Sequence, residues 1–473
     1  MASNQSDRTR IGLVSFSDGR KRVHETLREG IEEHQQVLRE LIESTGAEAV
    51  TAEQVVYTPR LARRETKRLL AADVAGAVLN IPVFAFPNLC AIAARVLSRP
   101  AAILSPGESG LPGMGGLLAA GGALRQIGLW HERIWGPYDS DETRRRVGVF
   151  VRAAGARHAL CGKVYGQIGG RSIGMLTGVS SSPAEWLRVF GVDIDHADQS
   201  EILRVAETID DAERERIVNW LEQATGGVEY AEGTKLTRET LKYQAACAAA
   251  VKQIAEQRQF DFVGIKCHYD LSEYYCTQCL SAAFLPSRLD WDGPREPMVC
   301  ACEADGDGAL TMQILQEISG RPALFMDLRH YDERRGLWTL CNCGGQSVHY
   351  SRRSDDEAEN VAAVRLVPVI AKYGGVGAHV PYLGCEGPMT FARIQHDERR
   401  PGLIAFRGEA VAADPDWPQA SCPQWPHIYA KFEVEPRGLL AGLHANHVHA
   451  VAGDWLDELA LFARIADIDF VGP

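Results

Sequence analysis

The stretch Ile11-Gly-Leu-Val-Ser-Phe16 is a short apolar run, and the polar turn Ser17-Asp-Gly19 follows it directly. From about residue 20 to residue 44, apolar side chains recur at helical spacing, so the sequence predicts a buried strand followed by a long helix. The same alternation continues with a helix over 61–72 and strands over 75–81 and 101–104. Strands that alternate with helices indicate an α/β fold with a parallel sheet.

The rest of the chain divides into two further parts. A second α/β segment has predicted helices over 210–224 and 237–257 and strands over 261–267, 297–303 and 322–328. After about Gly336 the apolar runs shorten and Gly and Pro become more frequent, which predicts a β-rich domain closed by a helix near 455–465. We therefore expect three domains, over 1–160, 161–340 and 341–473.

Composition narrows the class of protein. The 473 residues are 45% hydrophobic and 24% charged, as in an ordinary globular protein. A formal charge of −12 argues against nucleic acid as a partner, because nucleic-acid binding draws on clustered Lys and Arg. No apolar run is long enough for a membrane span, and residues 1–10 lack the apolar centre of a signal peptide. We expect a cytoplasmic protein with no membrane partner.

Neither the glycine cluster nor the cysteines strongly indicate a binding site. The cluster from Gly113 to Gly122 does not form a dinucleotide fingerprint, so we interpret it as a close-packed helix and loop, and a nucleotide-dependent oxidoreductase is rejected. The twelve cysteines of a large chain without a signal peptide are expected to be reduced, and mostly core residues. Zinc bound by Cys267, Cys276 and Cys279 is a minor alternative.

Two carboxylates carry the strongest chemical signal. Glu303 ends one strand pattern and Asp327 ends the next, and ligands bind at the carboxyl ends of strands in open α/β sheets. If the two strands are neighbours, roughly 5 Å apart, both carboxylates reach one divalent ion. The alternative is that each acid is a solvated loop residue or a helix cap. Asp305 and Asp307, in the turn after Glu303, are expected to be caps.

A third element is His444-Ala-Asn-His447-Val-His449, near the C-terminal end. Its three histidines offer a metal ligand, but the sequence does not decide which one, nor whether the segment is a strand. An oxygen-rich site with one imidazole suits Mn²⁺, Mg²⁺ or Co²⁺ better than zinc held by thiolates.

Further residues at strand ends are candidate substrate contacts. Lys266 and His268 follow a predicted strand end, at the same sheet edge as Glu303, and Arg171 follows a Gly-Gly pair. A plain surface salt bridge is the alternative for Arg171.

At this point the chain resembles a known family. The segments Trp291-Asp-Gly-Pro-Arg-Glu-Pro297 and Phe325-Met-Asp-Leu-Arg329, with Glu303 between them, are similar to the core of L-fucose isomerase and its relatives in the L-fucose/L-arabinose isomerase superfamily. Ser17-Asp-Gly-Arg20, Gly169-Gly-Arg-Ser-Ile-Gly174 and Ala445-Asn-His447 resemble the family in the same order. These colinear landmarks cover most of the chain.

The resemblance implies two Rossmann-like domains, a C-terminal β-barrel-like domain, Mn²⁺ as the preferred metal, and a trimer or hexamer with active sites between subunits. It implies that Glu303 and Asp327 are paired catalytic carboxylates that bind the metal, with His447 as the third ligand. It also implies that Arg20 and Asn446 contact substrate hydroxyls, Arg20 in a neighbouring subunit's site. Phe84 stands where L-fucose isomerase has a tryptophan, and this chain is shorter in its last third.

The function expected from the residues and the resemblance is a metal-dependent aldose–ketose isomerase that acts on a free monosaccharide, of the L-fucose or D-arabinose type, through a cis-enediol. Two alternatives stay open. One is an isomerase of an anionic sugar, such as the 6-sulfonated hexose sulfoquinovose, bound by Arg20, Arg171, Lys266, Arg288 and His268. The other is a non-catalytic sugar-binding protein on the same scaffold.

Overall fold

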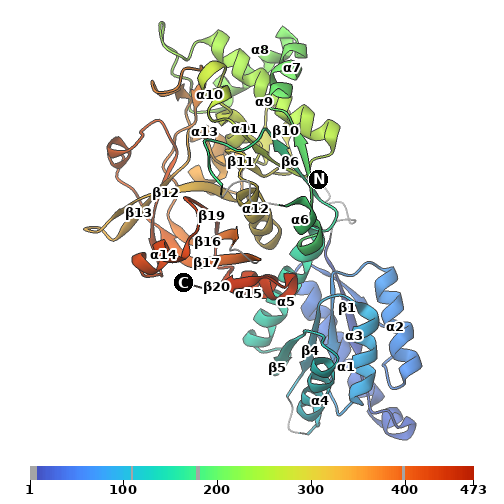
Figure 1. The fold of residues 1–473 in the computed structure, drawn as a ribbon. Coiled ribbons are helices and arrows are strands. Elements are labelled where there is room, and N and C mark those ends of the chain that lie inside the picture. The colour runs from blue at the N-terminus through green and yellow to red at the C-terminus, as the bar shows by residue number, and fades with distance from the viewer. Residues whose placement is uncertain (1–7, 108–109, 177–181, 397–399, 473) are drawn as a thin grey trace. The chain divides into compact units, whose positions relative to one another are not determined.

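The computed structural model describes residues 8–107, 110–176, 182–396 and 400–472. The chain divides into two compact units. The first unit is Met1–Ala159 with Asp457–Ala466, and the second is Leu160–Leu456 with Asp467–Pro473. Figure 1 labels the helices and strands of both. No helix in the described part of the chain is long and apolar enough to cross a membrane.

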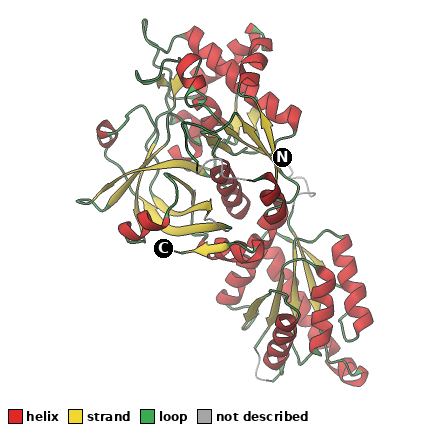
Figure 2. Ribbon diagram, viewed as in Figure 1, coloured by secondary structure: helices red, strands yellow, loops and turns green. Residues whose placement is uncertain are grey.

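The first unit is built on a five-stranded parallel sheet with strand order β2-β1-β3-β4-β5. Its strands are β1 (Arg10–Ser15), β2 (Glu48–Thr51), β3 (Gly76–Asn80), β4 (Ala101–Ser105) and β5 (Glu132–Trp135). The helices that follow them in turn are α1 (Lys21–Ser44), α2 (Pro59–Ala71), α3 (Pro87–Leu97), α4 (Gly113–Gln126) and α5 (Asp141–Ala159). Figure 2 shows helices on both sides of this sheet. The α/β alternation predicted for this region is confirmed.

Local packing explains the glycine cluster. At Gly116, in α4, a Cβ atom would lie 2.6 Å from the carbonyl oxygen of Val83, and at Gly113 it would lie 2.6 Å from that of Pro82. These contacts are closer than a side chain allows, so the glycines let the helix approach the backbone after β3. The prediction of a close-packed helix is confirmed.

The second unit contains a parallel sheet with strand order β11-β8-β6-β7. The strands are β6 (Val164–Ile168), β7 (Asp193–Ala197), β8 (Phe262–Ile265) and β11 (Cys300–Cys302). The helices of this part are α6 (Pro183–Val189), α7 (Ser200–Thr208), α8 (Asp211–Ala224), α9 (Arg238–Arg258), α10 (Asp270–Tyr274), α11 (Cys279–Phe284) and α12 (Gly306–Ser319). A short hairpin joins β9 (Leu289–Asp290) to β10 (Gly293–Pro294).

The same unit contains a large mixed sheet, in which all pairings are antiparallel except β17 with β20. Its strands are β12 (Leu324–Asp332), β13 (Leu337–Cys341), β16 (Gly387–His396), β17 (Pro401–Ala410), β18 (His427–Phe432), β19 (His447–Ala452) and β20 (Asp469–Val471). The pairings run β16-β19-β12-β13-β18-β17, and β17 also pairs with β16, so they return to their starting strand.

Shorter elements complete the chain. They are η2 (Val348–Ser351), α13 (Glu357–Ala362), the pair β14 (Val367–Pro368) and β15 (Ala378–His379), η3 (Trp417–Ala420), α14 (Pro436–Gly442) and α15 (Leu456–Ala466). A helix near 455–465 is thus confirmed, but residues 457–466 belong to the first unit and not to the β-rich part that the helix was predicted to close. Within the first unit, the Arg152 guanidinium donates to Glu458 of α15 at 2.6 Å, so this late helix packs on the N-terminal sheet domain.

One structural expectation is wrong. The strand that carries Asp327 does not join the parallel sheet beside β11, because β12 pairs with β13 and β19 in the mixed sheet. Glu303 and Asp327 therefore do not lie at the ends of neighbouring parallel strands. The physical reason is the long-range pairing of Phe325 with His449, which joins β12 to β19, a strand that begins more than a hundred residues later in the chain.

Helix α12 connects the two sheets of the second unit. Its residues from Gly306 to Leu315 are all buried, so it packs within the core on every side. It contacts β8 and β11 of the parallel sheet and β16 and β19 of the mixed sheet, and Figure 1 shows it between them. The turn that begins this helix therefore lies where the two sheets meet.

Candidate active site and metal centre

Glu303 lies in the turn between β11 and α12, directly after the last residue of the strand. Its backbone φ is +59°, and Ala304 follows at +53°. Two consecutive non-glycine residues in the left-handed region cost on the order of 1–3 kcal/mol each, and such strain collects at functional sites. The Glu303 side chain is buried, and its Oε2 accepts no hydrogen bond from the described residues. A buried carboxylate oxygen without a donor points to a ligand that the protein is built to hold.

His447 lies between the other two predicted ligands, Glu303 and Asp327. The Nε2 atom of His447, at the start of β19, is 3.5 Å from Glu303 Oε2 and 3.8 Å from Asp327 Oδ1, in β12. These three side chains come from the strand-to-helix turn and from two antiparallel neighbours of the mixed sheet. The structure thus brings Glu303, Asp327 and His447 together, although not in the way that the sequence reasoning assumed.

A buried carboxylate orients His447. Asp305 caps α12, where its Oδ1 accepts a hydrogen bond from the Gly308 amide at 2.9 Å, as predicted. Its Oδ2 lies 2.7 Å from Nδ1 of His447. The Arg393 guanidinium, itself buried in β16, donates to both oxygens of Asp305 at 2.5 and 3.0 Å. Asp305 therefore holds the imidazole so that Nε2 faces Glu303 and Asp327.

Asp305 and His447 shift each other's pKa values. Burial raises the pKa of Asp305, but the Arg393 charge and the His447 hydrogen bond outweigh it and hold this pKa well below its usual range. Burial lowers the pKa of His447, but its hydrogen bond to Asp305 and the neighbouring Glu303 and Asp327 carboxylates raise it to about 10. Imidazole must lose that proton to bind a metal, so a cation between the carboxylates would compete with it.

Asp327 accepts a hydrogen bond at one oxygen, and its side chain is partly exposed to solvent. Its Oδ1 accepts a hydrogen bond from the Asn446 amide at 2.8 Å. The Asp327 side chain is 16% exposed, whereas that of Glu303 is 8% exposed. Asn446, predicted as a substrate contact, is exposed directly before β19 and lies beside the carboxylates.

The second oxygen of Glu303 faces a different set of donors. Its Oε1 lies 3.8 Å from Nε2 of His268 and 3.9 Å from Sγ of Cys343. The Cys302 thiol is 3.4 Å from that of Cys343, and the Tyr373 hydroxyl is 3.1 Å from His268 Nε2. A hydrogen bond from Cys302, helped by the nearby His268, lowers the pKa of Cys343 to about 6 against the effect of burial.

The other residues that were predicted to contact the substrate lie in environments of their own. The Lys266 amine lies 2.6 Å from the Asp270 carboxylate, and Arg171 is exposed in the loop after β6. Arg20 and Phe84 belong to the first unit, where the Arg20 guanidinium pairs with Asp18 at 2.6 Å and the Phe84 side chain is exposed. Of these residues and His268, only His268 contacts a carboxylate of the candidate site within the described part of the chain.

The donor set fits a hard divalent ion. Two carboxylates and one imidazole, with a buried carboxylate oxygen that lacks a donor, match the ligand preferences of Mn²⁺, Mg²⁺ and Co²⁺. The hydrogen bond that the far nitrogen of His447 donates to Asp305 is the arrangement usual for a metal-bound histidine. The residues present therefore fit the predicted metal, whose identity stays a prediction.

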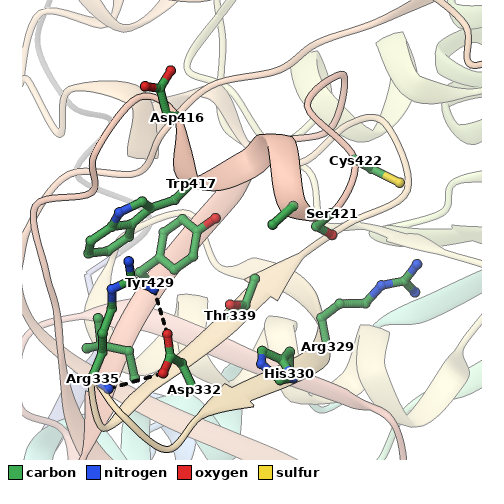
Figure 3. Close-up of a pocket in the computed structure, with 12 residues that line it drawn as sticks. Arg329, His330, Asp332, Arg335, Thr339, Asp416, Trp417, Ser421, Cys422 and Tyr429 are labelled. Atoms are coloured by element: carbon green, nitrogen blue, oxygen red, sulfur yellow. Dashed lines mark hydrogen bonds and ion pairs between the residues drawn. The ribbon is translucent and has the colours of Figure 1, made fainter.

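A pocket of about 580 Å³ opens along β12 and β13, beyond Asp327. Arg329, two residues after Asp327, lies at one end, and Arg335 lies at the other, paired with Asp332 and stacked over Trp417 (Figure 3). Thr339, Tyr429 and Ser421 line the space between them. The pocket is therefore polar, aromatic and cationic, as suits a sugar-sized ligand.

A chain of aromatic and cationic contacts links this pocket to the residues around Glu303. Trp425 is buried, and both Arg329 and Lys372 lie over its ring, at 5.3 and 4.9 Å. Lys372 also lies 5.3 Å from the Tyr373 ring, whose hydroxyl contacts His268. Contacts thus run continuously from Glu303 through His268 and Tyr373 to the pocket.

The sequence reasoning missed Asp305 as the support of His447, and it missed Arg393, Cys343 and Arg329. One signal for Arg393 is present, because it stands alone in the apolar run Phe391-Ala-Arg-Ile394, and an arginine inside a buried strand requires an acidic partner. Cys343 carries no comparable signal, since its contact with Glu303 depends on the end of β13.

Comparison with known proteins points to one family. Residues 8–162 match the family model of the first N-terminal domain of L-fucose isomerase, and residues 340–472 match that of its C-terminal domain. L-fucose isomerases of Escherichia coli (strain K12 / DH10B) and of Shigella dysenteriae are each 25% identical to this chain, over 63% of this chain and 61% of the relative. That of Citrobacter koseri is 25% identical over 49% of this chain and 44% of its own. The chain thus spans less than two thirds of the curated relatives it matches.

Proposed function

Because the chain belongs to the L-fucose isomerase family, we propose that it is a metal-dependent aldose–ketose isomerase that acts on a monosaccharide through a cis-enediol. The observation that carries this proposal is that His447 Nε2 lies within 3.8 Å of both Glu303 Oε2 and Asp327 Oδ1, and that Glu303 Oε2 is buried with no donor among the described residues. A binding protein has no need for two carboxylates and an oriented imidazole at a strained turn, so this geometry favours catalysis over simple sugar binding.

The reaction moves two protons. One leaves C2 of the aldose and arrives at C1, and the other leaves the hydroxyl at O2 and arrives at O1. Glu303 and Asp327 are the groups that take and return these protons, since both carboxylates face the same space. Stabilisation of the negative charge that develops on O1 and O2 is what a divalent ion held by Glu303, Asp327 and His447 supplies when bound.

The surrounding residues position these groups. Asp305 keeps His447 Nε2 directed toward the carboxylates, and Asn446 holds one oxygen of Asp327. Burial of Glu303 keeps bulk water from its side chain, which strengthens its electrostatic interactions. Each carboxylate is thus oriented before the substrate binds, and this preorganisation lowers the activation barrier.

Deuterium exchange tests the proposal. Metal-stripped protein is incubated with Mn²⁺ in D₂O and with L-fucose, D-arabinose, L-arabinose or a 6-sulfonated glucose, and proton NMR follows ketose formation and deuterium at C2. We expect exchange that requires added metal and is lost in Glu303→Gln and Asp327→Asn. Glu357→Gln is the matched control, because Glu357 is also buried but pairs with His349 and Asn360. Exchange that survives Glu303→Gln, or that needs no metal, would overturn the assignment.

The pocket beyond Asp327 favours a second candidate substrate, an aldose with an anionic group such as a sulfonate or phosphate. Arg329 and Lys372 face one Trp425 ring between the carboxylates and the pocket. Arginine pairs with sulfonate or phosphate through two parallel hydrogen bonds. The anion would thus lie at the end of the sugar remote from C1. A higher kcat/KM for a 6-sulfonated or 6-phosphorylated hexose than for the neutral sugars supports this candidate, and a lower one rejects it.

The architecture implied by the resemblance completes the proposal. The ring of strand pairings in the mixed sheet supports a barrel-like C-terminal domain, and the two parallel sheets support Rossmann-like domains before it. The boundaries at 160 and 340, and a homo-oligomer with active sites between subunits to which Arg20 and Phe84 contribute, remain predictions. Light scattering on the purified chain tests the subunit count.

A further inference from the structure

Glu303 presents its two oxygens to chemically different neighbours. Oε2 faces the imidazole of His447, beside Asp327, whereas Oε1 faces the imidazole of His268 and the thiol of Cys343. The first set contains only oxygen and nitrogen donors, and the second adds sulfur. Metal ions discriminate between such sets by their affinity for sulfur.

We propose that His268, Glu303 and Cys343 form a second metal site, selective for a thiophilic divalent ion of the Zn²⁺ class, which shares Glu303 with the site of the proposed isomerase. The inference rests on a different donor set, and it does not require the protein to be an isomerase.

Distances support this site. One ligand atom from each of the three residues lies within 4.8 Å of the other two. Oε1 is 3.8 Å from His268 Nε2 and 3.9 Å from Cys343 Sγ. Zinc bonds of about 2.0–2.3 Å in a tetrahedral arrangement place ligand atoms about 3.3–3.6 Å apart. The Nε2 atom of His268 and the Sγ atom of Cys343 therefore need to approach Glu303 Oε1 by only a few tenths of an ångström.

Supporting contacts orient the ligands. The Nδ1 atom of His268 lies 3.0 Å from the Ser272 hydroxyl, so Nε2 is the nitrogen that faces Glu303. This second contact is the usual feature of a metal-binding histidine. His268 and Glu303 are both buried, and Cys343 is partly buried. Three ionisable side chains from three separate segments are thus packed together, an arrangement that is costly unless charge is compensated.

A second thiol strengthens the preference for a thiophilic ion. Cys302, the residue before Glu303, has its Sγ 3.4 Å from that of Cys343. Zinc accepts two thiolates readily, whereas Mn²⁺ and Mg²⁺ prefer oxygen donors. Cys302 and Glu303 are consecutive in the chain where β11 leads into α12. A thiol and a carboxylate therefore both face the end of β13.

Cobalt is the probe for this site, because a thiolate bound to Co²⁺ gives a sulfur-to-metal charge-transfer absorption in the near ultraviolet that oxygen and nitrogen ligands do not give. Metal-stripped, reduced full-length protein is titrated with Co²⁺. We expect the band to saturate at about one Co²⁺ per chain, to disappear on addition of Zn²⁺, and to persist on addition of Mn²⁺.

Variants assign the band to its ligands. We expect Cys343→Ser to abolish it and His268→Gln to weaken Co²⁺ binding at least tenfold. Cys422→Ser is the matched control, a partly buried thiol beside Trp425 that should leave the band unchanged. Asp327→Asn should also retain the band while it removes the exchange reaction, which separates this site from the proposed function.

Three results would overturn the proposal. They are the absence of the band in the reduced protein, its survival in Cys343→Ser, and unchanged Co²⁺ affinity in His268→Gln. If circular dichroism shows that Cys343→Ser does not fold, the His268→Gln titration decides on its own.

Discussion

Replacement of Asp305 by asparagine tests whether the orientation of His447 matters for metal binding, because His447 itself is unchanged in this variant. In the native chain, Oδ1 of Asp305 accepts the Gly308 amide and Oδ2 faces His447 Nδ1. Asparagine is an equally good helix cap, so the start of α12 is preserved. The new amide nitrogen, however, donates a hydrogen bond to Nδ1, whereas the native carboxylate oxygen accepts one from it. The imidazole proton then moves to Nε2, the atom that faces Glu303 and Asp327, and blocks it as a metal ligand.

The expected effect has two parts. Loss of a partner that orients a metal-bound histidine weakens metal affinity about 10- to 100-fold, which corresponds to about 1.4–2.8 kcal/mol. The variant also leaves the fully buried Arg393 guanidinium without its counter-charge, and removal of one partner of a buried ion pair costs about 3–5 kcal/mol of folding stability. Affinity and stability should therefore both fall, for different reasons.

Electron paramagnetic resonance of free Mn²⁺ measures the dissociation constant, and urea unfolding of the metal-free protein measures stability. The affinity is compared only at urea concentrations where the variant is fully folded. Asp307→Asn is the control, since Asp307 begins the same helix but pairs with His396. A dissociation constant for Asp305→Asn within twofold of the native value would refute the role of Asp305 in orienting His447.

Three further outcomes follow from the contacts described. Asn446→Ala removes the donor to Asp327 Oδ1 and should lower kcat/KM about tenfold, measured by ketose formation. Arg329→Met should raise KM at least tenfold for an anionic aldose but not for a neutral one. Glu65→Gln should destabilise the first unit by about 2 kcal/mol at pH 7. Burial raises the pKa of Glu65, but Arg64 and its other hydrogen bonds lower it below the unfolded value. The wild-type advantage in urea unfolding should therefore shrink as pH falls below about 4.

The sequence predicts the first unit well because its signals are local. Each strand is followed within a few residues by the helix that covers it, and the helical spacing over residues 20–44 agrees with α1 to within one residue at its start. Gly116 could be interpreted from its neighbours alone, because the backbone it touches, at Val83, belongs to the preceding strand-to-helix connection. Short-range periodicity therefore determines this part of the fold.

The candidate site depends on contacts that local periodicity does not encode. Before pairing is known, the segments that end in Glu303 and Asp327 have the same pattern, yet β11 joins β8 and β12 joins β19. Likewise, the choice of His447 among three histidines depends on Asp305, 142 residues earlier in the chain. Sequence reasoning found the ligand types, but only the assembled sheets show which atoms meet.

The turn between β11 and α12 explains why the site has this composition. Within four residues it presents Cys302 to the end of β13, Glu303 to both donor sets, and Asp305 to His447. The left-handed backbone at Glu303 makes this possible, because an extended chain would alternate the side chains across the strand. The buried helix α12 anchors the turn against both sheets, so the strain persists only when both are in place. We therefore predict that a metal bound at this turn would stabilise the association of the two sheets, by about 2.7 kcal/mol at a metal concentration one hundred times the dissociation constant.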